Sequence, residues 1–100
     1  MNMQQMMIQA QKMQRELQKA QEALAKKEFK VNKAGLVEIV VLGDKTIQSI
    51  NIEEDGFDPD NKEMVEELIV SGLNELFEQI DEESEAINEK ITGRSGGLGF

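Results

Sequence analysis

The stretch that decides the fold is residues 34–52, AGLVEIVVLGDKTIQSINI. Its first part, LVEIVVL at residues 36–42, is rich in β-branched side chains and nearly continuous in apolar character. Such a run is typical of a central strand with both faces partly covered. Because side chains alternate along a strand, Val37, Ile39 and Val41 share one face. This face is the predicted centre of the core.

Strands are also predicted on both sides of this run. Residues 46–52, TIQSINI, are predicted as the third strand, and residues 28–32, EFKVN, alternate apolar and polar side chains. Alternation of this kind indicates half-buried strands. By the same rule Ile50 lies on one face of the third strand and Ile47 on the other. The short turns KAG and GDK join the strands, so we expect a three-stranded antiparallel sheet over residues 28–53.

A long helix is predicted before the sheet, over residues 2–27. Apolar residues recur there at intervals of three and four, which is the 3.5-residue repeat of a coiled-coil seam. Most of the other residues are Gln, Lys, Glu and Ala, which favour helix. At 1.5 Å per residue the helix would be about 40 Å long, so part of it projects from a small core or meets a partner. The seam residues are Met3, Met6, Ala10, Met13, Leu17, Ala20 and Leu24.

A second long helix is predicted over residues 59–92. Asp60 and Glu63 have the spacing of a capping box, and apolar residues recur at helical spacing as far as Ile91. Gly93 is expected to end the helix, because glycine is the commonest residue just past a helix C-terminus. Residues 93–100 are then a flexible glycine-rich tail.

The chain therefore reads as one α+β domain over residues 1–100, with the order α-β-β-β-α. A three-stranded sheet covered by a single helix leaves an edge strand and part of a face unprotected. Two long helices with apolar stripes also extend beyond so small a core. A homodimer would relieve both problems, and we expect one. The residues assigned to packing or to the dimer are Met13, Leu17, Leu24, Val37, Ile39 and Val41.

Charge is distributed unevenly along the chain. Residues 1–33 carry seven basic and three acidic side chains, a net charge of +4, whereas residues 34–100 carry four basic and seventeen acidic ones, a net charge of −13. An acidic segment repels nucleic acid, but the basic end can approach it. The sign asymmetry is thus more informative than the total of −9.

Composition argues against several classes of function. The chain has no Cys and no His, so it lacks thiolate metal ligands and the side chain most used for acid–base catalysis. No phosphate-binding loop or nucleophile motif occurs, and no apolar run approaches the roughly 20 residues that span a membrane. We expect a cytoplasmic protein that is not an enzyme and has no metal, cofactor, membrane association or small-molecule substrate.

The best candidate for function is the outer side of the first helix. Lys12, Arg15, Lys19 and Lys26 fall away from the apolar seam at intervals of three, four and seven residues, with only Glu22 interrupting them. Such a face can neutralise DNA phosphates, and the many glutamines beside it can donate hydrogen bonds to phosphate oxygens. From composition alone, a helix face rich in Lys and Gln is more often a plain solvated surface. The predicted DNA contacts are Lys12, Arg15, Lys19, Lys26 and Lys27.

The sequence as a whole resembles the YbaB/EbfC family of bacterial nucleoid-associated proteins. The resemblance covers nearly the full chain, and its most specific part is the glycine and β-branched pattern of residues 34–52. Three other segments match in the same order: MQQMMIQAQKMQREL at residues 3–17, DNKEMVEELIVSGLNELFEQI at 60–80 and GGLGF at 96–100.

The resemblance implies a tweezer-like homodimer with central sheets and projecting helical arms. It also implies binding of double-stranded DNA with little sequence preference, a change in DNA conformation, and roles in nucleoid organisation, gene regulation and DNA protection. The arms are the DNA-contacting surface of the family, which corresponds here chiefly to Lys12, Arg15 and Lys19. An alternative takes account of the strongly acidic second helix: a helical protein-interaction module with weak or no DNA binding.

Overall fold

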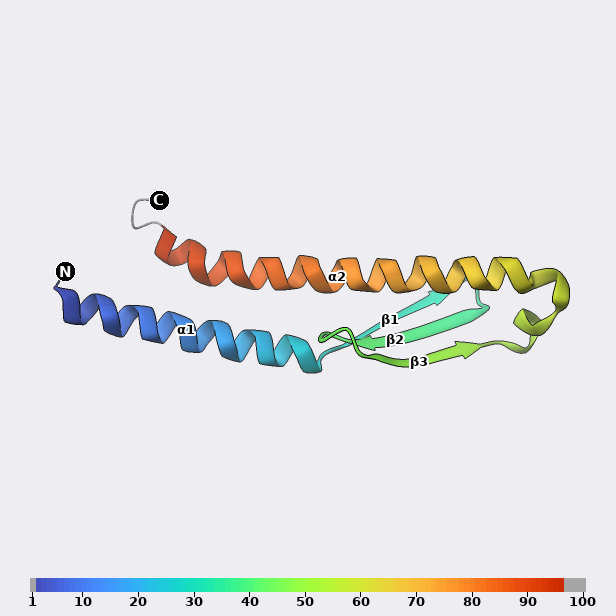
Figure 1. Cartoon of the computed structure of the whole chain (residues 1–100), viewed down its shortest axis with the longest axis horizontal. Helices are drawn as coiled ribbons and strands as arrows, with labels where there is room; N and C mark the ends of the chain where they lie inside the picture. Colours follow the sequence, from blue (N-terminus) through green and yellow to red (C-terminus); the bar gives the residue numbers. More distant parts are fainter. Residues whose placement is uncertain (1, 97–100) are drawn as a thin grey trace.

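A three-stranded antiparallel sheet lies at one end of an elongated molecule (Figure 1). A computed structural model describes residues 2–96, with side chains as far as Gly93. The strands are β1 (Glu28–Lys33), β2 (Val37–Leu42) and β3 (Ile47–Ile52), with β2 in the middle. This arrangement confirms the predicted α+β fold and its antiparallel sheet.

Two tight turns connect the strands. Between β1 and β2, Ala34 and Gly35 both have positive φ, and the Leu36 N–H donates to the Lys33 carbonyl at 2.9 Å. Positive φ at both central residues suits the twist of the paired strands. The Asn32 side chain adds a hydrogen bond from the Gly35 N–H at 3.0 Å. These local contacts fix the register of the hairpin, in which Lys33 pairs with Val37.

The register of β3 differs from the simple alternation expected from the sequence. A shift between Val40 and Val41 places Ile47 opposite Val41, while Ile50 lies opposite Ile39. Cross-strand partners point to the same face of a sheet. Ile47 therefore lies on the same face as Ile50, and the expectation of opposite faces was wrong because the irregularity adds one residue to β3.

Helix α2 (Lys62–Gly96) crosses the sheet and covers β1 and β2. Val37, Ile39 and Val41 are completely buried beneath it, and so is Leu76 on the helix itself. At Gly72 the helix comes so close to the sheet that an added Cβ would lie 2.7 Å from Cδ1 of Ile39. The other buried members of the core are Leu24, Phe29, Val65 and Ile80.

The limits of α2 differ from the predicted 59–92. Residues Pro59–Asn61 form a separate turn of 3₁₀ helix, in which Asp58 accepts a hydrogen bond from the Asp60 N–H at 2.9 Å. Another short 3₁₀ segment, Glu54–Phe57, precedes it. At the other end the helix runs past Gly93 to Gly96, so residues 93–96, which were assigned to the tail, belong to the helix; residues 97–100 lie outside the described part. Glycine in a helix costs only about 1 kcal/mol, which the preceding turns can offset.

Helix α1 (Met3–Lys26) lies beside the second half of α2 and runs in the opposite direction (Figure 1). Asn2 and Gln5 form a reciprocal capping box at its start. Burial along its seam increases toward the sheet, from exposed Met3 and Met6 to buried Leu24. One end of α1 is thus anchored in the core and the other projects beyond it.

The turn between β2 and β3 receives the end of α1. The Gly43 N–H donates to the Lys27 carbonyl at 2.9 Å and the Asp44 N–H donates to the Ala25 carbonyl at 3.2 Å. These bonds satisfy backbone carbonyls at and just beyond the end of the helix. A Cβ at position 43 would lie 1.8 Å from the Leu24 carbonyl oxygen. Only glycine therefore permits this approach of backbone to backbone.

Replacing Gly43 by alanine should destabilise the fold by more than about 2 kcal/mol, because the clash is with backbone that cannot move aside without breaking the contact. Urea unfolding followed by circular dichroism measures the change. Gly93→Ala is the control, since nothing lies within 4 Å of its Cβ position. It should be neutral or stabilising by up to about 1 kcal/mol. Equal stability of the two variants would contradict the close approach.

Candidate nucleic-acid interface

Four basic side chains form a line along the outer side of α1. Lys12, Arg15, Lys19 and Lys26 are all exposed, whereas Leu17 and Leu24 on the opposite side are half-buried and buried. At about 100° per residue the four lie within a narrow sector that faces away from α2. We call these four residues the basic stripe.

The charges of the basic stripe are not matched by carboxylates in the described part of the protomer. Within residues 2–93, whose side chains the structure describes, no ion pair joins any of the four to a carboxylate. Glu22, which interrupts the stripe, accepts a hydrogen bond from Gln18 at 3.4 Å. The positive charges are therefore available to an external anion.

Lys27 is in a different situation from the stripe. Its ammonium lies 2.6 Å from a carboxylate oxygen of Glu83 on α2 and 5.0 Å from the centre of the Phe29 ring. Both contacts direct the side chain toward α2 and β1 rather than along the basic stripe. Of the five predicted DNA contacts, the structure thus brings four together on one face and places Lys27 apart.

Other lysines of the sheet are paired in the same way. Lys33 lies 2.5 Å from Glu75, and Lys45 lies 2.8 Å from Asp81 and 5.9 Å from the centre of the Phe77 ring. The carboxylates of α2 that face inward therefore act as counter-ions for lysines of β1 and of the β2–β3 turn. Such partly exposed pairs contribute little stability each, about 1 kcal/mol or less.

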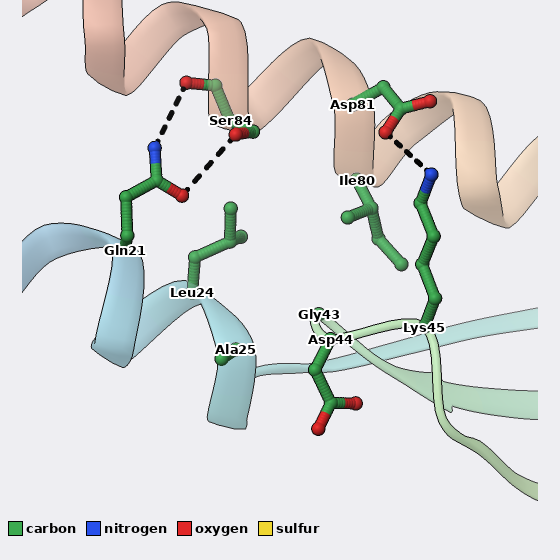
Figure 2. A pocket seen from close by; sticks show the side chains of 9 residues that line it. All are labelled: Gln21, Leu24, Ala25, Gly43, Asp44, Lys45, Ile80, Asp81 and Ser84. Carbon is green, nitrogen blue, oxygen red and sulfur yellow. Dashed lines mark hydrogen bonds and ion pairs between the residues drawn. The ribbon is translucent and has the colours of Figure 1, made fainter.

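Figure 2 shows how polar side chains join α1 to α2. The Gln21 amide donates to the Ser84 carbonyl at 3.3 Å, and the Ser84 hydroxyl donates to the Gln21 side-chain oxygen at 3.3 Å. The same amide donates to Asn88 at 3.1 Å. Leu24 and Ile80 form the apolar floor of a shallow cleft beside these groups. Its polar rim is occupied with internal contacts, so the cleft is no evident ligand site.

The turn at the end of the cleft holds an ionised Asp44. Hydrogen bonds from the side chain and the backbone N–H of Thr46 lower the pKa of Asp44 below its ordinary value, because they favour the charged carboxylate. The backbone bond measures 2.9 Å. Asp44 is fully exposed, and its role is to shape the turn that receives α1.

The outer side of α2 carries the opposite charge from the outer side of α1. Its exposed carboxylates follow one another over most of the helix, and no base of comparable density accompanies them. The molecule therefore presents a basic α1 and an acidic α2. The exposed acids of this outer side are Glu63, Glu66, Glu67, Glu78, Glu82, Glu85 and Glu89.

Sequence reasoning did not find the inward-facing partners on α2. Ser84 continues the apolar stripe of Ile80, Ile87 and Ile91 at intervals of four, three and four, and this spacing was the available signal. Glu83 lies beside it and gives no separate sign of its contact with Lys27. Among the described residues, no cluster of three potential metal ligands occurs, and no helix is long and apolar enough to cross a membrane.

Comparison with known proteins identifies relatives over almost the whole chain. The sequence model of the YbaB/EbfC DNA-binding family matches residues 1–95. A nucleoid-associated protein of Ruminiclostridium cellulolyticum is 43% identical over 98 residues, which cover 97% of this chain and 85% of the relative. Nucleoid-associated proteins of Agathobacter rectalis and Enterococcus faecalis are 45% and 43% identical, over 96% and 91% of this chain and 86% and 88% of theirs.

The pair between Lys27 and Glu83 should contribute at most about 1 kcal/mol, because both side chains remain partly in water. A double-mutant cycle with Lys27→Gln and Glu83→Gln, measured by urea unfolding, gives the coupling energy directly. A coupling above about 2 kcal/mol would mean that this contact, rather than apolar packing, holds the end of α1 on α2.

Proposed function

The chain belongs to the YbaB/EbfC DNA-binding family, and we propose that it binds double-stranded DNA in the nucleoid through the basic stripe of α1. In this proposal it acts as a homodimer, binds with little sequence preference and alters the conformation of the duplex. The single observation that carries the proposal is the basic stripe on the outer side of a projecting helix, which has no carboxylate partner within residues 2–93. The names of the relatives, nucleoid-associated proteins, support the cellular setting.

The length of the stripe suits a DNA backbone. From Lys12 to Lys26 it covers about 21 Å along α1, and phosphates follow one another at about 3.4 Å of rise along each strand. Lysine and arginine side chains can adjust to phosphates at this spacing, and each neutralised phosphate releases condensed counter-ions. Counter-ion release then drives binding.

Low sequence preference follows from the kind of side chains in the stripe. Three of the four are lysines, whose flexible ammonium groups act as point charges. They lack the planar guanidinium with which arginine makes paired hydrogen bonds to the edge of a base. Arg15 is the exception. Neighbouring glutamines are suited to phosphate oxygens as hydrogen-bond donors.

The acidic outer face of α2 supports one orientation on DNA. Carboxylates repel phosphates, so α1 faces the duplex and α2 faces away from it. Lys27 stays a predicted contact: a phosphate near the end of α1 would have to compete with Glu83 for its ammonium. The carboxylates of α2 thereby limit how many basic side chains can contact the duplex.

The homodimer is supported by an uncovered apolar strip on β3. Ile50 and Ile47 point to the face that α2 covers, yet they remain 40% and 46% exposed because α2 lies over β1 and β2. β3 is also an edge strand, whose free backbone groups favour pairing or cover. A second copy packed on this strip would bury both isoleucines.

Neutralising three members of the stripe should weaken DNA binding and flatten its salt dependence. Lys12→Gln, Arg15→Gln and Lys19→Gln together remove three phosphate contacts, so the slope of log affinity against log salt should fall by about 2.7. Fluorescence anisotropy with a short labelled duplex measures this. The matched control changes Lys30, Lys33 and Lys45 to Gln, which removes the same charge from residues already paired with carboxylates. Equal effects of the two triple variants would show that only net charge matters.

A charge on the exposed strip should disrupt the dimer. Ile50→Lys is expected to give a monomer in light scattering at micromolar concentration, because an ammonium group would be buried at the interface. Ser49→Lys, on the opposite face of the same strand, should leave the dimer intact. Dissociation by the second variant and not by the first would move the interface to the other face of the sheet.

A second candidate function, a helical protein-interaction module with weak or no DNA binding, is favoured by the acidic outer face of α2. In that case wild-type protein would show little or no affinity for DNA even at low salt. The anisotropy measurement therefore separates the two functions.

A further inference from the structure

The projecting end of α1 exposes four apolar side chains within six residues. Met3, Met6, Met7 and Ile8 are 81%, 57%, 61% and 58% exposed. Isolated apolar residues on a surface need no explanation, but a group of four at the free end of a helix does. The described part of the protomer provides no cover for them.

Two of the four have an explanation in the fold. Met3 and Met6 continue the apolar seam that faces α2, at intervals of three and four from Ala10 and Met13. Ile8 does not belong to this seam. It precedes Lys12, Arg15 and Lys19 at intervals of four, three and four, so it lies on the same side of α1 as the basic stripe. Ile8 extends the stripe by one turn toward the free end.

Ile8 is also an unfavourable choice for this place in the helix. It is the only β-branched residue in α1, whose other residues are nearly all strong helix formers. β-branched side chains lose rotamer freedom in a helix and are normally retained where packing repays the loss. Here the protomer supplies no such packing in the part that the structure describes. A residue that breaks a local preference without a contact inside the protomer points to a contact outside it.

We propose that Ile8 is a DNA-contacting residue, which places an apolar side chain against sugars or bases of the duplex bound along the basic stripe. This inference rests on the proposed function. DNA is the partner of Ile8 because Ile8 continues the basic stripe. A duplex whose phosphates lie on Lys12, Arg15 and Lys19 extends over the next turn of the same helix face. DNA offers apolar surface there, since isoleucine can pack on sugars in the minor groove or wedge between base pairs.

An apolar contact and a phosphate contact have different salt signatures, which makes the inference testable. Phosphate contacts set the slope of log affinity against log salt, whereas burial of an aliphatic side chain shifts affinity without changing the slope. Ile8→Ala should therefore weaken binding about fivefold at every salt concentration, as expected for loss of a partly buried aliphatic group. Because alanine favours helix, α1 should remain folded in this variant.

Met7→Ala is the matched control. Met7 is as exposed as Ile8 but lies about 100° around the helix, outside the stripe. We expect its affinity for a short labelled duplex to match the wild type in fluorescence anisotropy, and Ile8→Leu to restore most of the loss. Circular dichroism and light scattering should show the same helix content and the same assembly for all variants.

Three results would overturn the inference. Wild-type affinity in Ile8→Ala, an equal loss in Met7→Ala, or a change of assembly in Ile8→Ala would each remove Ile8 from the DNA surface. The last result would assign it to a protein interface instead. If the wild type itself binds no DNA at low salt, the proposed function fails and this inference fails with it, whereas normal binding by Ile8→Ala refutes this inference alone.

Discussion

Burial of β1 and β2, on one face of the sheet, under α2 is the interaction on which the rest of the structure depends. Val37, Ile39 and Val41 lose all contact with water there, and Gly72 allows the helix to sit directly on Ile39. A small sheet has no second layer to stabilise it, so the direction of α2 across the strands is fixed by this contact. The part of α2 beyond the sheet then becomes the surface on which α1 lies.

The inner and outer sides of α1 have different roles. Its inner side is held by Leu24 in the core and by the Gln21 contacts with Ser84 and Asn88. Its outer side carries the exposed lysines and the arginine of the basic stripe, with Ile8 at the projecting end. The carboxylates of α2 that face inward neutralise Lys27, Lys33 and Lys45 near the sheet, whereas the basic stripe on α1 has no carboxylate partner within residues 2–93. Charge separation along the chain thus becomes charge separation in space.

The sequence was sufficient for the elements of the fold but not for every boundary or contact. The β-branched run of residues 36–42 and the turns beside it predicted the sheet to within a residue or two, because strand formation there depends on local pattern. The face on which Ile47 lies was predicted wrongly, because the sequence of one strand does not show where its pairing with the next strand shifts by a residue. Gly93 was taken as the end of α2, although a helix tolerates one exposed glycine. The pairing of Lys27 with Glu83 joins residues 56 apart and depends on the angle at which α1 leaves the sheet. The basic stripe was identified from spacing alone, whereas its DNA role and the dimer stay predictions.

The joint between α1 and β1 consists of a single extended residue, Lys27, held by the Gly43 turn. With so short a joint, the helix has no slack in which to absorb a change of length. Inserting one residue between Arg15 and Leu24 would rotate every side chain before the insertion by about 100° relative to the sheet. An insertion or deletion in α1 therefore keeps the apolar seam against α2 and the basic stripe on the outside only if it is close to seven residues, or two helical turns, long. The length of α1 can thus change only in steps of about seven residues, and relatives with a longer or shorter first helix should differ by whole heptads.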